Sequence, residues 1–282
     1  MSRIDDFRQR MQTRREAFRD GVAEAAPRGC READLRAIVR YLTPTPDEML
    51  QWWETVARSP HVKANARYAA AAAATTLGYL PDNGEVNAFA RAAEGGGGFQ
   101  IVFYGGAVRF SRLASLAVAE DLCGRPGTAA RFARAMEDFG GEVSAKLAAE
   151  VLTECGMDEG FGAPGVAGKA QAVSAGMISG VLAHEMGHVC LGHVEGPNYY
   201  AANQEVARNH EREADSFASS VTASTPFGEY LYEGMLFWHA ALARQQGADA
   251  VESTHPLERE RLENLIRANP SKASALGIRM PT

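Results

Sequence analysis

The stretch "LAHEMGHVCLGH", from Leu182 to His193, decides how this chain is interpreted. It places three histidines, a glutamate and a cysteine within twelve residues. A helix advances about 100° per residue, so His184 and His188 lie one turn apart on one face and can reach a single metal ion. The apolar flank "GMISGVLA" indicates that this helix is buried, and buried histidines need partners. The stretch therefore predicts a metal site.

The residues around the two histidines indicate the chemistry of this site. Zn²⁺ suits it, because zinc takes nitrogen and oxygen ligands and, in catalytic sites, leaves one position open for water. Glu185 follows the first histidine, where its carboxylate can hydrogen-bond to that water and take its proton. Cys190 lies about 200° around the helix from His188, so we interpret it as a core thiol. The alternative, a helix that carries this pattern by coincidence, is disfavoured by the apolar flank.

A third protein ligand must come from elsewhere in the chain. The metzincin spacing would require a histidine where Val194 stands, and His193 is one residue short of it. The next predicted helix offers Glu211 and Asp215, one turn apart on one face. A glutamate from a second helix completes a His-His-Glu site, as in thermolysin-type enzymes. Asp215 could then accept a hydrogen bond from a ligating histidine.

Neighbouring polar residues have simpler interpretations. Glu213 is about 200° from Glu211 and is expected on a solvated face, and His210 is expected to be structural or exposed. A purely structural zinc site would instead be closed by four protein ligands, often cysteines. His193, His210 or His255 could supply a fourth ligand, which would signal an inhibited state.

Composition indicates a soluble globular protein. The 282 residues are 46% hydrophobic and 23% charged, with a net charge of -6. This balance disfavours nucleic acid and anionic membranes as partners. The charged N-terminus lacks a signal peptide, and the apolar stretch Ala170–Ala183 is shorter than the roughly 20 residues of a membrane span. We therefore expect a cytoplasmic protein without an integral membrane segment, whose four scattered cysteines are reduced.

The hydrophobic pattern predicts an α+β fold that is predominantly helical. Thr45, Pro46 and Glu48 give a helix start with a capping box, and further helices are predicted over residues 169–192 and 205–222. Another is predicted to begin at Pro256 and to end at Pro270. Two short strands, at 86–90 and 99–104, predict a small antiparallel sheet joined by a glycine-rich loop. About fifty residues after Phe110 are read as extra helical material.

Four segments, taken together, resemble the zinc metallopeptidases of the HtpX-like and CAAX-prenyl-protease type, a branch of the gluzincins. They occur in the same order as in the family. The last of the four carries Leu262 where the family has isoleucine. The segments are "VNAFA" (Val86–Ala90), "LAHEMGHVCLGH", "EREAD" (Glu211–Asp215) and "STHPLERERLENL" (Ser253–Leu265).

The resemblance covers about residues 80–265 and implies a zincin-like catalytic domain. We expect this domain to extend over residues 63–282, and a helical segment over 1–62, outside the resemblance, to pack on it or cap it. It implies that His255 lies near the site, where it could stabilise the oxyanion, and that one strand pairs with an extended substrate. The implied zinc ligands are His184, His188 and Glu211, with Glu185 as the general base and Asp215 orienting a ligand. The implied substrate strand consists of Val86, Asn87, Ala88, Phe89 and Ala90.

The function that these observations predict is hydrolysis of extended or unfolded protein segments by a soluble zinc endopeptidase. The chain departs from the resembled family in the long loop "RAAEGGGG" and in lacking an evident membrane segment, which argues against membrane and prenylated substrates. The alternative is a latent or inactive protein on the same fold that acts by binding a regulatory partner or by self-association. The extra helices motivate this alternative, and the intact Glu185 argues against it.

Overall fold

The computed structural model describes about two thirds of the chain, and contacts divide the chain into two compact units. The described residues are 9, 37, 39–136, 142–154, 165–195, 204–225, 235–236, 238–239, 258–268 and 270–275. The first unit comprises Met1–Gln51, Tyr79–Asn87 and Tyr104–Ser174, and the second comprises Trp52–Gly78, Ala88–Phe103 and Ala175–Thr282. Most of the predicted N-terminal helical segment before residue 39 lies outside the described residues, and the predicted boundary at residue 62 stays a prediction.

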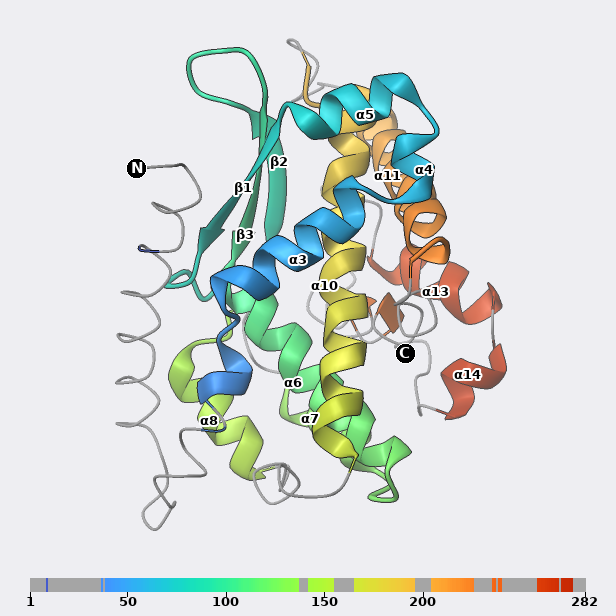
Figure 1. Ribbon diagram of the computed structural model, residues 1–282. Coiled ribbons are helices and arrows are strands. Elements are labelled where there is room, and N and C mark those ends of the chain that lie inside the picture. Colours follow the sequence, from blue (N-terminus) through green and yellow to red (C-terminus); the bar gives the residue numbers. More distant parts are fainter. Residues whose placement is uncertain are drawn as a thin grey trace. The chain divides into compact units, whose positions relative to one another are not determined.

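The described chain is predominantly helical with one small sheet, which confirms the predicted α+β class (Figure 1). The helices are α3 (Pro46–Ala57), α4 (Pro60–Lys63), α5 (Ala66–Ala73), α6 (Gly105–Leu122), α7 (Thr128–Ala135), α8 (Ala145–Glu154), α10 (Val166–Leu191), α11 (Gln204–Ala223), α13 (Glu258–Ala268) and α14 (Pro270–Ala275). Helices α10 and α11 confirm the two helices predicted to carry the site, and α6 to α8 confirm the helical material after Phe110.

Helix α3 begins with the predicted capping box. The backbone N–H of Thr45 donates to Oε2 of Glu48 at 2.6 Å, and the N–H of Glu48 donates to Oγ1 of Thr45 at 3.1 Å. These bonds satisfy two backbone donors that a helix start leaves without intrahelical partners. The local sequence is therefore sufficient to fix this helix start.

The hairpin of the sheet confirms the two predicted strands. Strand β2 (Ala88–Ala92) pairs antiparallel with β3 (Phe99–Tyr104), and Ala88 lies opposite Phe103. Strand β2 begins two residues later than predicted, because the N–H of Asn87 donates to the carbonyl of Glu85 in a tight local turn at 3.0 Å. Only the last three residues of "VNAFA" are thus in a strand.

A third strand was not predicted, and it makes the sheet mixed rather than antiparallel. Strand β1 (Thr75–Leu80) follows the alanine-rich helix α5 directly and gives the strand order β1-β3-β2. The N–H of Phe99 donates to the carbonyl of Ala74 at 3.1 Å, and Gly78 lies beside Val102, so residue numbers rise together along β1 and β3. The two strands are therefore parallel. Sequence periodicity predicts strands but not their order or direction in a sheet.

Within the first unit, the central helix is α6, which begins where β3 ends. A Cβ on Gly105 or Gly106 would clash with the carbonyl oxygens of Pro81 and Gly84, so this close approach requires glycine. The buried guanidinium of Arg109 donates to three backbone carbonyls, those of Val143, Pro81 and Asn83, at 2.6, 2.8 and 3.2 Å. This side chain therefore joins α6 to two other segments of the unit, one at residues 81–83 and one at Val143.

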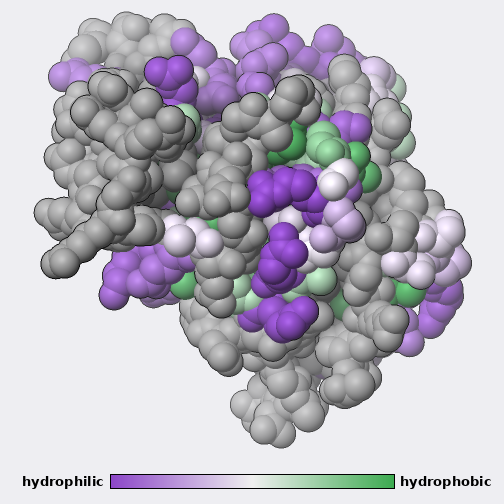
Figure 2. Space-filling view, turned by 90° about the horizontal axis from the view of Figure 1, so that it is seen from below, coloured by the Kyte–Doolittle hydropathy of each residue, from purple (hydrophilic) through white to green (hydrophobic). Residues whose placement is uncertain are grey.

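Among the described residues, one helix is long and apolar enough to cross a bilayer. Helix α10 has 26 residues, but 72% of its apolar window is buried within the protein. On the face shown in Figure 2, hydrophilic side chains gather in the centre, and hydrophobic ones occupy smaller areas beside them. Most of this apolar helix thus contacts other parts of the protein.

Candidate metal centre

Within the second unit, helices α10 and α11 approach each other closely at two small residues. A Cβ on Gly187 of α10 would lie 3.1 Å from Cα of Ala214 and 3.3 Å from Cβ of Phe217 on α11. Gly187 belongs to the "HEMGH" motif and Ala214 to "EREAD". Larger side chains at this crossing would push the backbones apart. The small residues in both motifs thus bring Glu211 of α11 to the histidines of α10.

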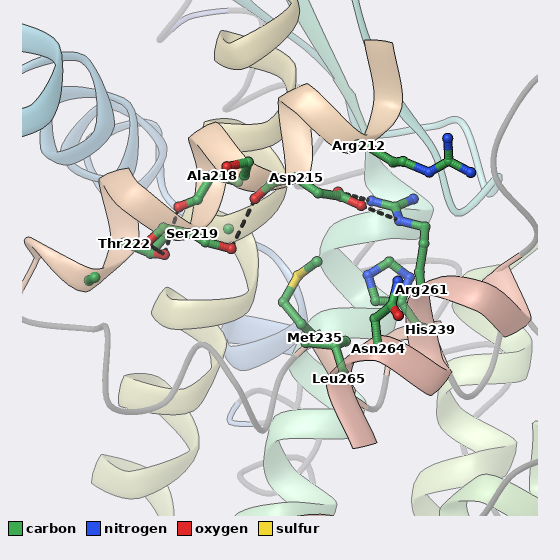
Figure 3. A pocket seen from close by; sticks show the side chains of 13 residues that line it. Arg212, Asp215, Ala218, Ser219, Thr222, Met235, His239, Arg261, Asn264 and Leu265 are labelled. Atoms are coloured by element: carbon green, nitrogen blue, oxygen red, sulfur yellow. Dashed lines mark hydrogen bonds and ion pairs between the residues drawn. The ribbon is translucent and has the colours of Figure 1, made fainter. Parts of the chain in front are cut away.

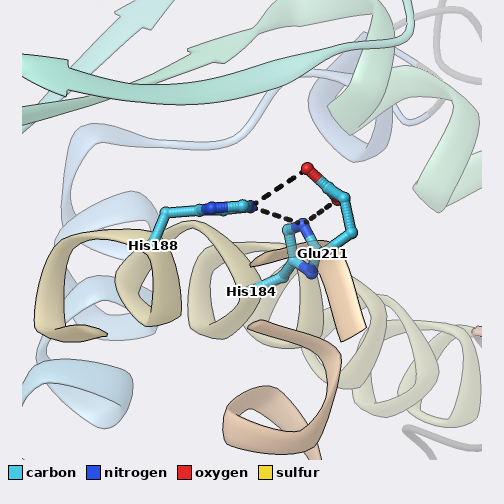
Figure 4. A group of neighbouring side chains, drawn as sticks. All are labelled: His184, His188 and Glu211. Carbon is cyan, nitrogen blue, oxygen red and sulfur yellow. Dashed lines mark hydrogen bonds and ion pairs between the residues drawn. The ribbon is translucent and has the colours of Figure 1, made fainter. Parts of the chain in front are cut away.

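Three side chains from these helices converge, as Figure 4 shows. The Nε2 atoms of His184 and His188 are 3.2 Å apart. Oε2 of Glu211 lies 3.2 Å from Nε2 of His184, and Oε1 of Glu211 lies 3.4 Å from Nε2 of His188. The predicted ligands therefore form one group that could hold a metal ion.

The spacing of the donor atoms fits a zinc ion. Tetrahedral Zn²⁺ with bonds of about 2.0 to 2.1 Å holds its ligand atoms about 3.3 to 3.4 Å apart. The two Nε2 atoms, 3.2 Å apart, are close to one edge of such a tetrahedron, and the carboxylate of Glu211 reaches one nitrogen with each of its oxygens, at 3.2 and 3.4 Å. Two nitrogens and a carboxylate are also a donor set that catalytic zinc sites use. His184, His188 and Glu211 would thus hold the ion.

The electrostatics of the group also favour a cation. His184 and Glu211 are only 7% and 6% exposed. Burial lowers the pKa of His184, but hydrogen bonds with Asp215 and Glu211 outweigh this effect and raise the pKa to about 10. The protein therefore stabilises positive charge at this position, which is the requirement of a cation site.

Asp215 lies behind the first histidine. Its Oδ1 accepts a hydrogen bond from Nδ1 of His184 at 2.9 Å, which leaves Nε2 directed toward the group. Burial would raise the pKa of Asp215, but the hydrogen bond from His184 and the charge of Arg261 outweigh it and hold that pKa well below its usual range. An ionised carboxylate in this position fixes the orientation of a ligating imidazole.

Arg261 of helix α13 is a site residue that sequence reasoning missed. Its Nε donates to Oδ2 of Asp215 at 2.9 Å, and its Nη2 donates to Oδ1 at 2.5 Å. The available signal was its place in "STHPLERERLENL", one of the four segments that carry the resemblance. The arginine therefore belongs to the support of the metal centre.

Replacement of Arg261 by methionine is expected to destabilise the metal-free protein by about 1–3 kcal/mol. The change removes two charge-assisted hydrogen bonds and leaves the part-buried carboxylate of Asp215 without its cation. Urea unfolding in excess chelator measures the effect. Arg267→Met is the matched control on the same helix, because its ion pair with Glu263 is exposed and should contribute under about 0.5 kcal/mol. Equal losses in the two variants would contradict this role of Arg261.

A second chain of contacts lies behind the other histidine. Nδ1 of His193 lies 3.2 Å from Nδ1 of His188, and Nε2 of His193 lies 2.9 Å from Oε2 of Glu213. His193 also stacks on His210, with ring centroids 4.0 Å apart. Burial lowers the pKa of His193 to about 4, although the hydrogen bond with Glu213 raises it. Among the described residues, His193 and His210 are not members of the metal-binding group.

The remaining predicted site residues are placed as follows. Glu185 follows His184 on α10 and is 8% exposed. The thiol of Cys190 is buried and donates to the carbonyl of Tyr68, away from the metal-binding group as predicted, and burial raises its pKa to about 12. His255 lies outside the described residues. Ala88, Phe89 and Ala90 lie in β2, at one edge of the strand order.

A cavity of about 480 Å³ adjoins the centre (Figure 3). Asp215 and Arg261 line one part of it, and Met235, His239 and Leu265 line another. Because Asp215 also contacts His184, the cavity is connected to the metal centre through one side chain.

The donor set and its buried setting on two helices are typical of metal-dependent hydrolases. The family model described as Peptidase U49 matches residues 164–279. The match spans α10, α11, α13 and α14 and covers less than half of the 282 residues. It supports a peptidase, and a peptidase implies a protein substrate. It gives no specific support to the HtpX-like or CAAX-prenyl-protease type.

No curated protein and no solved structure shows a significant match to the chain.

Proposed function

We propose that the chain is a soluble zinc-dependent endopeptidase that hydrolyses extended or unfolded protein segments. The observation that carries this proposal is the convergence of His184, His188 and Glu211 into one group that could hold a metal ion, inside the region matched by a peptidase family. The resemblance of four segments to HtpX-like gluzincins agrees with this choice. The low exposure of the group favours chemistry in a dry site, where electrostatic interactions are stronger than in water.

In the proposed mechanism, peptide hydrolysis begins with attack of water on the scissile carbonyl carbon. A bound Zn²⁺ would lower the pKa of that water and polarise the carbonyl. Glu185 takes one proton from the attacking water and passes it to the leaving amine as the C–N bond breaks. The second proton of the water stays on the new carboxyl group and then moves to the amine, so the products at neutral pH are a carboxylate and an ammonium group. Asp215 and Arg261 keep His184 in the tautomer with the hydrogen on Nδ1, so that the lone pair of Nε2 faces the ligand group.

The substrate is proposed to bind as an extra strand. Strand β2 stands at one edge of the sheet, and an edge strand binds an extended peptide through main-chain hydrogen bonds that are largely independent of sequence. In Figure 4 the sheet lies on the same side of α10 as the three metal-binding side chains. Val86 and Asn87 precede β2 and would contact the substrate at its end. His255 is proposed to stabilise the oxyanion.

One observation favours a latent form of the same protein as a second candidate. His184, Glu185 and Glu211 are only 7%, 8% and 6% exposed, so little of their surface is open to a polypeptide. A form of the protein in which these side chains stay buried would be latent. A regulatory partner or self-association could then control access.

Incubation with a denatured protein tests the proposed function. Product termini are read by mass spectrometry with the untreated protein, with a chelator, and after Zn²⁺ is restored. New termini that disappear with the chelator and return with Zn²⁺ are the expected result. Bound zinc without cleavage would favour the latent form, and cleavage that persists in the chelator would contradict a metal-dependent mechanism.

A further inference from the structure

The end of helix α10 turns the chain back toward the metal centre. The N–H of His193 donates to the carbonyl of His188 at 2.9 Å, and the N–H of Gly192 donates to that of Val189 at 3.1 Å. These two bonds, with Gly192 at φ 84°, form a Schellman motif. This reversal places the His193 side chain beside the ring of His188, where a continued helix would not hold it.

The hydrogen positions in this cluster follow from the chemistry of its members. A carboxylate can only accept, so the contact of Glu213 with Nε2 of His193 requires a hydrogen on that nitrogen. A neutral imidazole carries one N–H, so Nδ1 of His193 is an acceptor for the Nδ1–H of His188. The lone pair of His188 is then on its other nitrogen, Nε2, which lies in the metal-binding group, 3.2 Å from Nε2 of His184 and 3.4 Å from Oε1 of Glu211.

We infer that Glu213 and His193 are positioning residues that hold His188 in the tautomer and orientation needed for metal binding. The contact series Glu213–His193–His188 supports the second ligand as Arg261–Asp215–His184 supports the first. Glu213 faces solvent, with its side chain 61% exposed, so it acts on His188 through the imidazole of His193. Stacking of His193 on His210 fixes the intermediate ring. This inference rests on the proposed metal site but not on peptidase activity.

The effect is expected in metal affinity. Partners that orient a ligating histidine typically contribute a factor of about 10 to 100 in affinity. Glu213→Gln keeps the side-chain size and removes only the charge, so a loss of about 10-fold is expected. His193→Phe keeps the buried ring and the stacking on His210 but removes both hydrogen bonds, and a loss toward about 100-fold is expected.

The test is Zn²⁺ affinity, measured by competition with a chromophoric chelator on the full chain. The variants are Glu213→Gln, His193→Phe and the double variant, with Glu205→Gln as a control that makes the same exchange at an exposed position of α11. Because Glu213 acts only through His193, its replacement should have no further effect in the His193→Phe background. The visible spectrum of the Co²⁺-substituted protein should change in both single variants and not in the control.

Several outcomes would overturn the inference. One is a Glu213→Gln variant that matches Glu205→Gln in affinity and spectrum, and another is a double variant in which the two losses multiply. Glu213→Gln alone decides the question if His193→Phe does not fold, since Glu213 is exposed. Absence of divalent-metal binding by the wild-type chain would overturn the metal site and this inference together. Metal binding without peptidase activity would overturn the proposed function alone.

Discussion

Replacement of Glu185 by glutamine is expected to reduce cleavage of an unfolded protein by about 10²- to 10⁴-fold. The amide has nearly the same shape as the carboxylate but cannot take the proton of the attacking water or deliver it to the leaving amine. Glu185 is not one of the three residues whose donor atoms converge, so the bound metal should remain. Loss of turnover with retained zinc would thus separate the general base from the ligands.

The measurement combines turnover with metal content. Initial rates on a denatured protein are compared with the zinc-to-protein ratio from elemental analysis, for wild type and Glu185→Gln. Glu195→Gln, at an exposed position after α10, is the control for an equal change of net charge. If Glu185→Gln cleaved as fast as wild type, the base would have to be another residue. If it lost the metal as well, Glu185 would contribute to binding.

The sequence predicted the parts of the site that depend on helical periodicity. His184 and His188 share a helix face because of their spacing, and Glu211 and Asp215 share another for the same reason. Local hydrogen bonding was equally predictable, as the capping box at Thr45 shows. In both cases the interacting residues lie within about one turn of each other, so the backbone geometry of the helix decides the contact.

The parts that were missed depend on contacts between distant segments. Arg261 reaches Asp215 across 46 positions of sequence, and no periodicity predicts that pairing. His193 was assessed as a candidate ligand by the metzincin spacing alone, which does not predict that the turn at Gly192 brings its ring to His188. Glu213 does face solvent as predicted, yet it also pairs with His193. Strand β1 was missed because an alanine-rich helix runs directly into it.

Replacement of Glu211 by glutamine is expected to lower zinc affinity by more than about 100-fold, because loss of a ligand should exceed the 10- to 100-fold effect of residues that only orient one. Glu211 is the single anionic member of the group, and a neutral amide oxygen would leave the cation with no ligand charge. Removing this carboxylate should also lower the pKa of His184 in the metal-free protein, since Glu211 is one of the two hydrogen-bonding carboxylates that raise it.

Competition with a chelator measures the affinity, and NMR titration of the histidine rings measures the pKa of His184 in chelator-treated protein. The two readouts answer different questions, because a variant that merely unfolds would lose zinc but would bring every histidine to its ordinary pKa. Glu211→Gln should leave the pKa of His193 low, since burial rather than Glu211 sets that value. Unchanged zinc affinity in this variant would remove Glu211 from the ligand set, and the metal would then need a third ligand from residues that do not converge in this structure.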